Sequence, residues 1–72
     1  MKMQSETVEL FVNGVSRSLD AQTLADVVLR EGLEGFKVAT AVNGRFIPVT
    51  ERSTTVLSSG DTIEIVSARQ GG

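Results

Sequence analysis

The sequence predicts an α+β fold in which one sheet wraps around one helix. Apolar and polar residues alternate with a period of two in several short segments, as in half-buried strands. Asn-Gly occurs twice between such segments, at positions 13–14 and 43–44, and predicts type I′ hairpin turns because both residues tolerate positive φ. A helical period separates the two hairpins. The expected order is therefore hairpin, helix, hairpin, connection and final strand.

The first strands are expected at residues 8–12 and 15–19, joined by the first Asn-Gly turn. A helix should begin after Thr23, because this residue can cap it and Asp26, three positions later, completes a capping-box pattern. Gly32 or Gly35 should end the helix. Three apolar residues share one face of it: Leu24, Val27 and Val28.

The second hairpin should begin with a strand at residues 38–42, and Pro48 predicts an edge position or an early end for the returning strand. Residues 50–59 are expected to form an irregular connection whose Val56 and Leu57 fill the bottom of the core. Hairpin turns alone are expected to account for the two Asn-Gly pairs. Near the helix end, solvation is the expected state of Glu31 and Glu34.

The final strand, residues 62–68, alternates two isoleucines on one side with more exposed positions on the other. If the isoleucines face the helix, the opposite face of the sheet carries a small apolar patch. Apolar side chains exposed together commonly mark a docking surface, although a register that buries the aromatic residue is the alternative. The expected docking residues are Phe11, Ala39, Ala41, Val66 and Ala68.

Composition excludes several classes of function. The 72 residues, 40% of them hydrophobic, can bury one modest core, so we expect a single domain. The chain has no cysteine and no histidine, which argues against disulfides, thiolate metal sites and triad catalysis. A net charge of −2, without tyrosine or tryptophan, argues against nucleic-acid binding. With no apolar run or signal pattern for a membrane, a cytoplasmic location is expected.

The sequence ends in Gln70, Gly71 and Gly72. Two glycines make a thin segment that can thread a narrow enzyme channel and present a carboxylate, which is ionised at neutral pH. Acyl chemistry on that carboxylate would need activation, for instance by ATP. We expect residues 1–6 to be a flexible leader, 7–68 the domain and 69–72 a flexible tail.

The resemblance of this chain to a known family rests on longer motifs. Residues 7–72 resemble the β-grasp, ubiquitin-like fold, with a mixed four- to five-stranded sheet on one main helix. Three motifs carry a narrower resemblance: Phe-Val-Asn-Gly, then Val-Ala-Thr-Ala-Val-Asn-Gly with Ile47-Pro48, and the ending Ile-Glu-Ile-Val-Ser-Ala-Arg-Gln-Gly-Gly after Gly60-Asp61. In these motifs the chain is similar to the ThiS family, the sulfur carriers of thiamine biosynthesis.

This resemblance implies a carrier that is the substrate of other enzymes. In the family, an E1-like adenylating enzyme of the ThiF type uses ATP to adenylate the terminal carboxylate, here on Gly72. A cysteine desulfurase relay then supplies sulfur to form a thiocarboxylate, which a ThiG-type thiazole synthase consumes. The resemblance implies no stably bound cofactor, no metal and no catalytic residue in the carrier. In ubiquitin-like carriers the open sheet face contacts the activating enzyme.

Other functions share these features. A carrier with the same chemistry serves molybdopterin synthesis, and a ubiquitin-like modifier is conjugated to other proteins. A β-grasp interaction module with incidental glycines is a third possibility.

Overall fold

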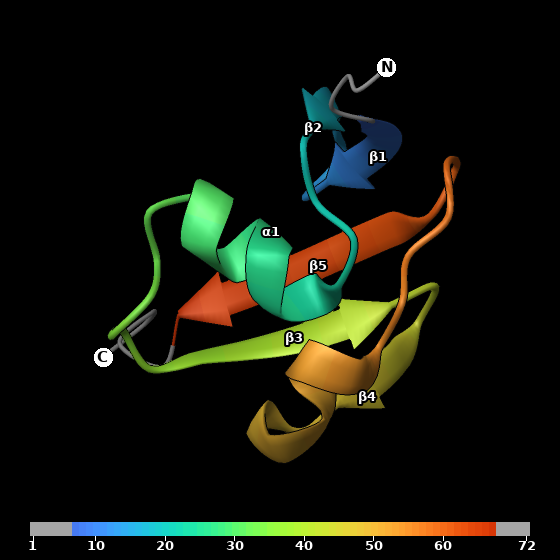
Figure 1. The fold of residues 1–72 in the computed structure, drawn as a ribbon. Helices are drawn as coiled ribbons and strands as arrows, with labels where there is room; N and C mark the ends of the chain where they lie inside the picture. Colours follow the sequence, from blue (N-terminus) through green and yellow to red (C-terminus); the bar gives the residue numbers. More distant parts are fainter. Residues whose placement is uncertain (1–6, 68–72) are drawn as a thin grey trace.

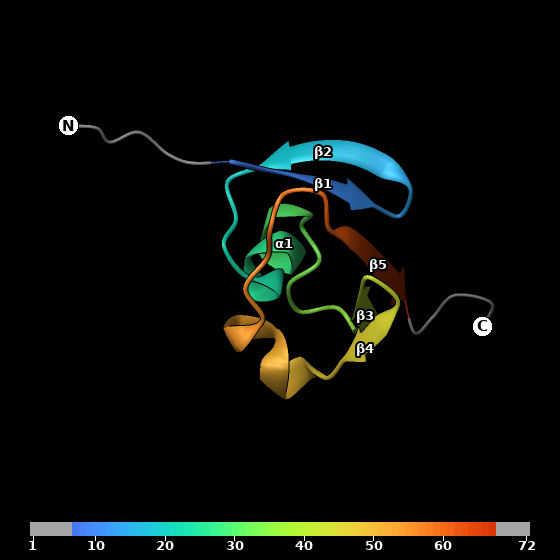
Figure 2. The same cartoon turned by 90° about the vertical axis from the view of Figure 1, so that its right-hand side faces the viewer.

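A mixed five-stranded sheet curves around one helix in the computed structural model, which describes residues 7–67 (Figures 1 and 2). The elements in chain order are β1 (Val8–Val12), β2 (Val15–Leu19), α1 (Leu24–Arg30), β3 (Val38–Val42), β4 (Arg45–Ile47), the 3₁₀ helix η1 (Val49–Thr54) and β5 (Thr62–Ser67). The sheet order is β2-β1-β5-β3-β4, with β1 parallel to β5 and the other neighbours antiparallel. The predicted fold class is confirmed, with five strands.

Both predicted hairpin turns are confirmed. Asn13 and Gly14 have φ angles of 51° and 83°, and Asn43 and Gly44 have 52° and 84°. Positive φ at both central residues is the geometry of a type I′ turn, whose twist matches that of the flanking strands.

The helix begins and ends where its sequence predicts. The Thr23 hydroxyl accepts a hydrogen bond from the Asp26 backbone N–H at 3.3 Å, and the Asp26 carboxylate accepts from the backbone N–H groups of Gln22 at 2.9 Å and Thr23 at 3.1 Å. These backbone donors, Gln22 first, lower the pKa of Asp26 below its ordinary value. At the other end Gly32 has a φ of 76°, which suits the left-handed conformation that ends a helix.

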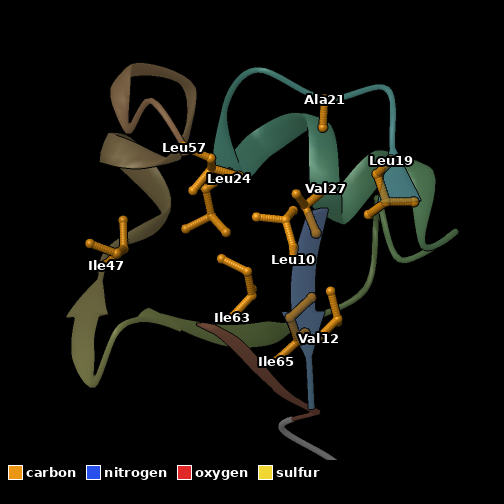
Figure 3. Packing of buried hydrophobic residues seen from close by; sticks show 10 residues of the cluster. All are labelled: Leu10, Val12, Leu19, Ala21, Leu24, Val27, Ile47, Leu57, Ile63 and Ile65. Carbon is orange, nitrogen blue, oxygen red and sulfur yellow. The ribbon is translucent and has the colours of Figure 1, made fainter. Parts of the chain in front are cut away.

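The core lies between the helix and the concave face of the sheet (Figure 3). A seven-residue helix is too short to be stable alone, so burial of its apolar face holds it in place. Both isoleucines of β5 face the helix and are buried, as expected, whereas the inward-facing Val8, Val38 and Val42 are only partly buried. The cluster consists of Leu10, Val12, Leu19, Ala21, Leu24, Val27, Ile47, Leu57, Ile63 and Ile65.

The connection between β4 and β5 differs from its predicted form. It contains η1, and beyond it Val56 forms an antiparallel bridge with Thr23 at the start of the helix. Consecutive residues in an extended segment point to opposite sides. Leu57 is therefore buried in the core, as predicted, whereas Val56 is 74% exposed and its predicted burial is wrong.

The neighbouring residues Leu57 and Val56 provide a matched test of this packing. Leu57→Ala should lower the free energy of unfolding by about 2–5 kcal/mol, because it leaves a cavity in the core. Val56→Ala should change it by less than about 0.5 kcal/mol, since its side chain is in solvent. Chemical denaturation of the three proteins measures both values, and equal losses would contradict the observed packing.

Candidate functional site

The strand that leads into the C-terminal residues, β5, occupies the centre of the sheet (Figure 1). It pairs in parallel with β1, with Phe11 opposite Thr62 and Val12 opposite Ile63. On its other side it pairs antiparallel with β3 along five residue pairs. Both neighbours therefore fix the direction of β5 up to its last residue, Ser67.

Asn13 extends the pairing of β1 with β5 beyond the end of β1. Its side-chain nitrogen donates to the Ile65 carbonyl at 3.1 Å, and its side-chain oxygen accepts from the Ile65 N–H at 2.9 Å. The side-chain amide thus takes the place of a backbone peptide where β1 turns away into its hairpin. The expectation that hairpin geometry alone accounts for Asn13 is wrong.

Asn43 fastens the second hairpin to the start of β5. Its side-chain oxygen accepts from the Thr62 N–H at 2.9 Å, and its side-chain nitrogen donates to the Asp61 carboxylate at 3.0 Å. Its own backbone N–H donates to the Thr62 carbonyl at 2.7 Å. Each asparagine therefore shapes a turn and also binds that turn to β5.

The convex face of the sheet carries most of the predicted docking residues. Phe11 is 45% and Val66 is 54% exposed, and Ala39 lies opposite Val66 in the register and is also exposed. Ala41 is half-buried on the same face. The predicted outward orientation of these four residues is confirmed, and the alternative register that buries Phe11 is excluded.

The remaining predicted site residues lie outside the described part of the chain. These are Ala68, the expected docking residue after Ser67, and the expected tail residues Gln70, Gly71 and Gly72.

Phe46 is a further residue of this face that the sequence interpretation missed. It lies opposite Ala41 in the β3–β4 register and is 64% exposed. The two-residue Asn-Gly turn fixes that register, so the sequence contained the information needed to find it. On its other side Ala41 lies opposite Glu64 of β5. We call Phe11, Ala39, Ala41, Phe46 and Val66 the open-face patch.

The two carboxylates near the helix end do not form a site. Glu31 is mostly buried and pairs with Arg17 of β2 at 3.0 Å, so its expected solvation is wrong, whereas Glu34 is exposed. This pair joins the helix end to the sheet. Residues 7–67 contain no cluster of metal-ligating side chains.

None of the helices described is long and apolar enough to cross a membrane.

One helix held in the curve of a mixed sheet, with the first and last strands parallel at its centre, defines a ubiquitin-like β-grasp domain. The model of the ThiS family matches residues 7–72, and the chain belongs to that family. The fold is similar to that of the thiamine biosynthesis protein ThiS from Geobacter metallireducens, with a TM-score of 0.72 and 20% identity over 83% of this chain and 93% of that one. No curated protein sequence matches the chain.

Adjacent residues of β4 test which side chains belong to the exposed face. Phe46→Ala should change the free energy of unfolding by less than about 0.5 kcal/mol, because this ring is largely in solvent. Ile47→Ala should lower it by about 2–5 kcal/mol, because Ile47 is in the core. A large loss for Phe46→Ala in chemical denaturation would show that the ring is needed for folding and would remove it from the open-face patch.

Proposed function

We propose that this protein is a sulfur carrier of thiamine biosynthesis that works through the carboxylate of Gly72. In this proposal a ThiF-type enzyme adenylates the carboxylate with ATP, and a cysteine desulfurase relay supplies the sulfur of a thiocarboxylate. A ThiG-type thiazole synthase then takes that sulfur. The observation that carries the proposal is the ThiS family match, which extends through Gly72.

The chemistry of the terminus accounts for each step. A carboxylate is a poor electrophile, and transfer of AMP from ATP, with release of pyrophosphate, makes an acyl-adenylate. The persulfide of the relay attacks the acyl-adenylate with loss of AMP, and a thiol of the partner enzymes then cleaves the S–S bond of the adduct, which leaves the thiocarboxylate and a disulfide. The resulting thiocarboxylate is an ionised nucleophile at neutral pH. Since the chain contains no cysteine and no histidine, we place the nucleotide, the sulfur relay and the proton transfers in the partner enzymes.

The described domain supports this role by its geometry. Both hairpin turns bind β5, so the strand that precedes residues 68–72 has a fixed direction. The open-face patch includes Val66 of this strand and Ala39 and Ala41 of its neighbour β3. We propose that the activating enzyme docks on this patch while its active site receives Gly72.

Intact-mass and fragment spectra test the proposal. The protein is incubated with a ThiF-type enzyme, ATP, a cysteine desulfurase, cysteine and a thiol reductant, which supplies the two electrons that reduce the persulfide sulfur. We expect Gly72 to gain the mass difference between sulfur and oxygen, because one carboxylate oxygen is replaced. The change should require ATP and should be abolished by deletion of Gly72.

Two controls make that result specific. Circular dichroism should show that the Gly72 deletion leaves the domain folded, since the described core ends before it. Val56→Ala, which keeps Gly72 and changes an exposed residue outside the open-face patch, should be modified as the wild type is. An unchanged mass with partners that modify their own ThiS would overturn the proposal, and an adduct with protein lysines would identify a modifier instead.

A further inference from the structure

A hollow of about 660 Å³ lies beside the open-face patch, at the edge of β3 and next to the end of β5. In Figure 1 the end of β5 lies next to the start of β3 and the loop before it. The hollow has apolar walls and two cations, and Ser67 at the end of β5 also lines it. The residues that matter here are Phe36, Lys37, Ala39, Val49, Arg52 and Val66.

The hollow exists because β4 is shorter than β3. β4 pairs only with residues 40–42 of β3 and ends at Ile47, where Pro48 leads the chain into η1. The Val38 carbonyl is thereby left without a strand partner on that edge. Arg52 of η1 covers it, donating from Nη2 to the Val38 carbonyl at 2.6 Å and from Nε to the Thr40 hydroxyl at 3.1 Å.

Arg52 carries a charge that its neighbours do not neutralise. Its side-chain hydrogen bonds go to neutral oxygens, and the ion pairs within residues 7–67 are Arg17 with Glu31 and Arg30 with Asp20. No aspartate or glutamate lines the hollow. Glu34 lines an adjoining hollow together with Arg52, but no ion pair joins the two.

This combination favours an occupant that is both acidic and apolar. A half-buried guanidinium has lost part of its hydration and gains most from a carboxylate, which accepts charge-assisted hydrogen bonds. Phe36 is 61% and Val49 is 67% exposed. A bulky apolar side chain of the occupant would cover both residues. Lys37 adds a second positive charge.

We propose that the enzyme that activates Gly72 inserts a carboxylate side chain, carried next to a bulky apolar residue, into this hollow against Arg52. The inference rests on the proposed function, because it assigns the hollow to the same partner. Two observations support that choice. The hollow shares Ala39 and Val66 with the open-face patch, and Ser67 places it at the base of the segment that the enzyme must hold.

Binding of the full-length chain to a ThiF-type enzyme without ATP, measured by isothermal titration calorimetry, tests the inference. Arg52→Gln removes the charge and keeps an amide donor for the Val38 carbonyl. We expect it to weaken binding by about tenfold, the effect of losing one charge-assisted hydrogen bond. Arg52→Lys, which keeps the charge, should recover part of the affinity. Arg45→Gln, the same change on exposed β4 outside the hollow, should bind as the wild type does.

A second variant guards against a folding defect in Arg52→Gln. Phe36→Ser alters an exposed ring outside the core, so it should weaken binding while leaving the melting temperature unchanged. Wild-type affinity in both Arg52→Gln and Phe36→Ser, or failure of the wild type to bind the enzyme, would overturn the inference. A wild type that binds through Arg52 but gains no thiocarboxylate would overturn the proposed function alone.

Discussion

The rest of the structure depends on the position of β5 between β1 and β3. Its two isoleucines supply the centre of the core, and its parallel pairing with β1 joins the two ends of the described chain. Because these two strands lie at opposite ends of the described chain, bringing them together costs loop-closure entropy. The two hydrogen bonds between the Asn13 side chain and the Ile65 backbone help to offset that cost, because they extend the short pairing of β1 with β5 by one residue.

The same strand alternation that builds the core also builds the surface that we assign to partners. The inward-facing residues of β3 and β5, Thr40, Ile63 and Ile65, are buried. The residues between them lie on the opposite face of the sheet. The end of β4 at Ile47 adds the hollow, since it leaves an edge of β3 where Arg52 donates to the Val38 carbonyl. The core and the proposed docking surface are therefore two faces of one sheet.

Local patterns in the sequence were sufficient for much of this structure. The capping box at Thr23, both Asn-Gly turns and the strand alternation each depend on residues within a few positions of one another, so they were predicted correctly. The errors involve distant partners. Val56 is exposed because it pairs with Thr23, Glu31 is buried because Arg17 reaches it, and Asn13 binds a residue 52 positions away. The role of Arg52 is not predicted from the sequence for the same reason, since only the fold brings this residue to β3.

We propose that this protein presents its open sheet face and tail to an enzyme that modifies it. The contact surface can be mapped by titrating the ¹⁵N-labelled chain with unlabelled ThiF-type enzyme and following amide chemical shifts and line widths. If the enzyme docks on the open sheet face, the largest early changes should fall on β3, the end of β5 and residues 35–37. The outward side of α1, including the exposed Leu29, should change least. Early changes centred on α1, with β3 and β5 unaffected, would contradict the account.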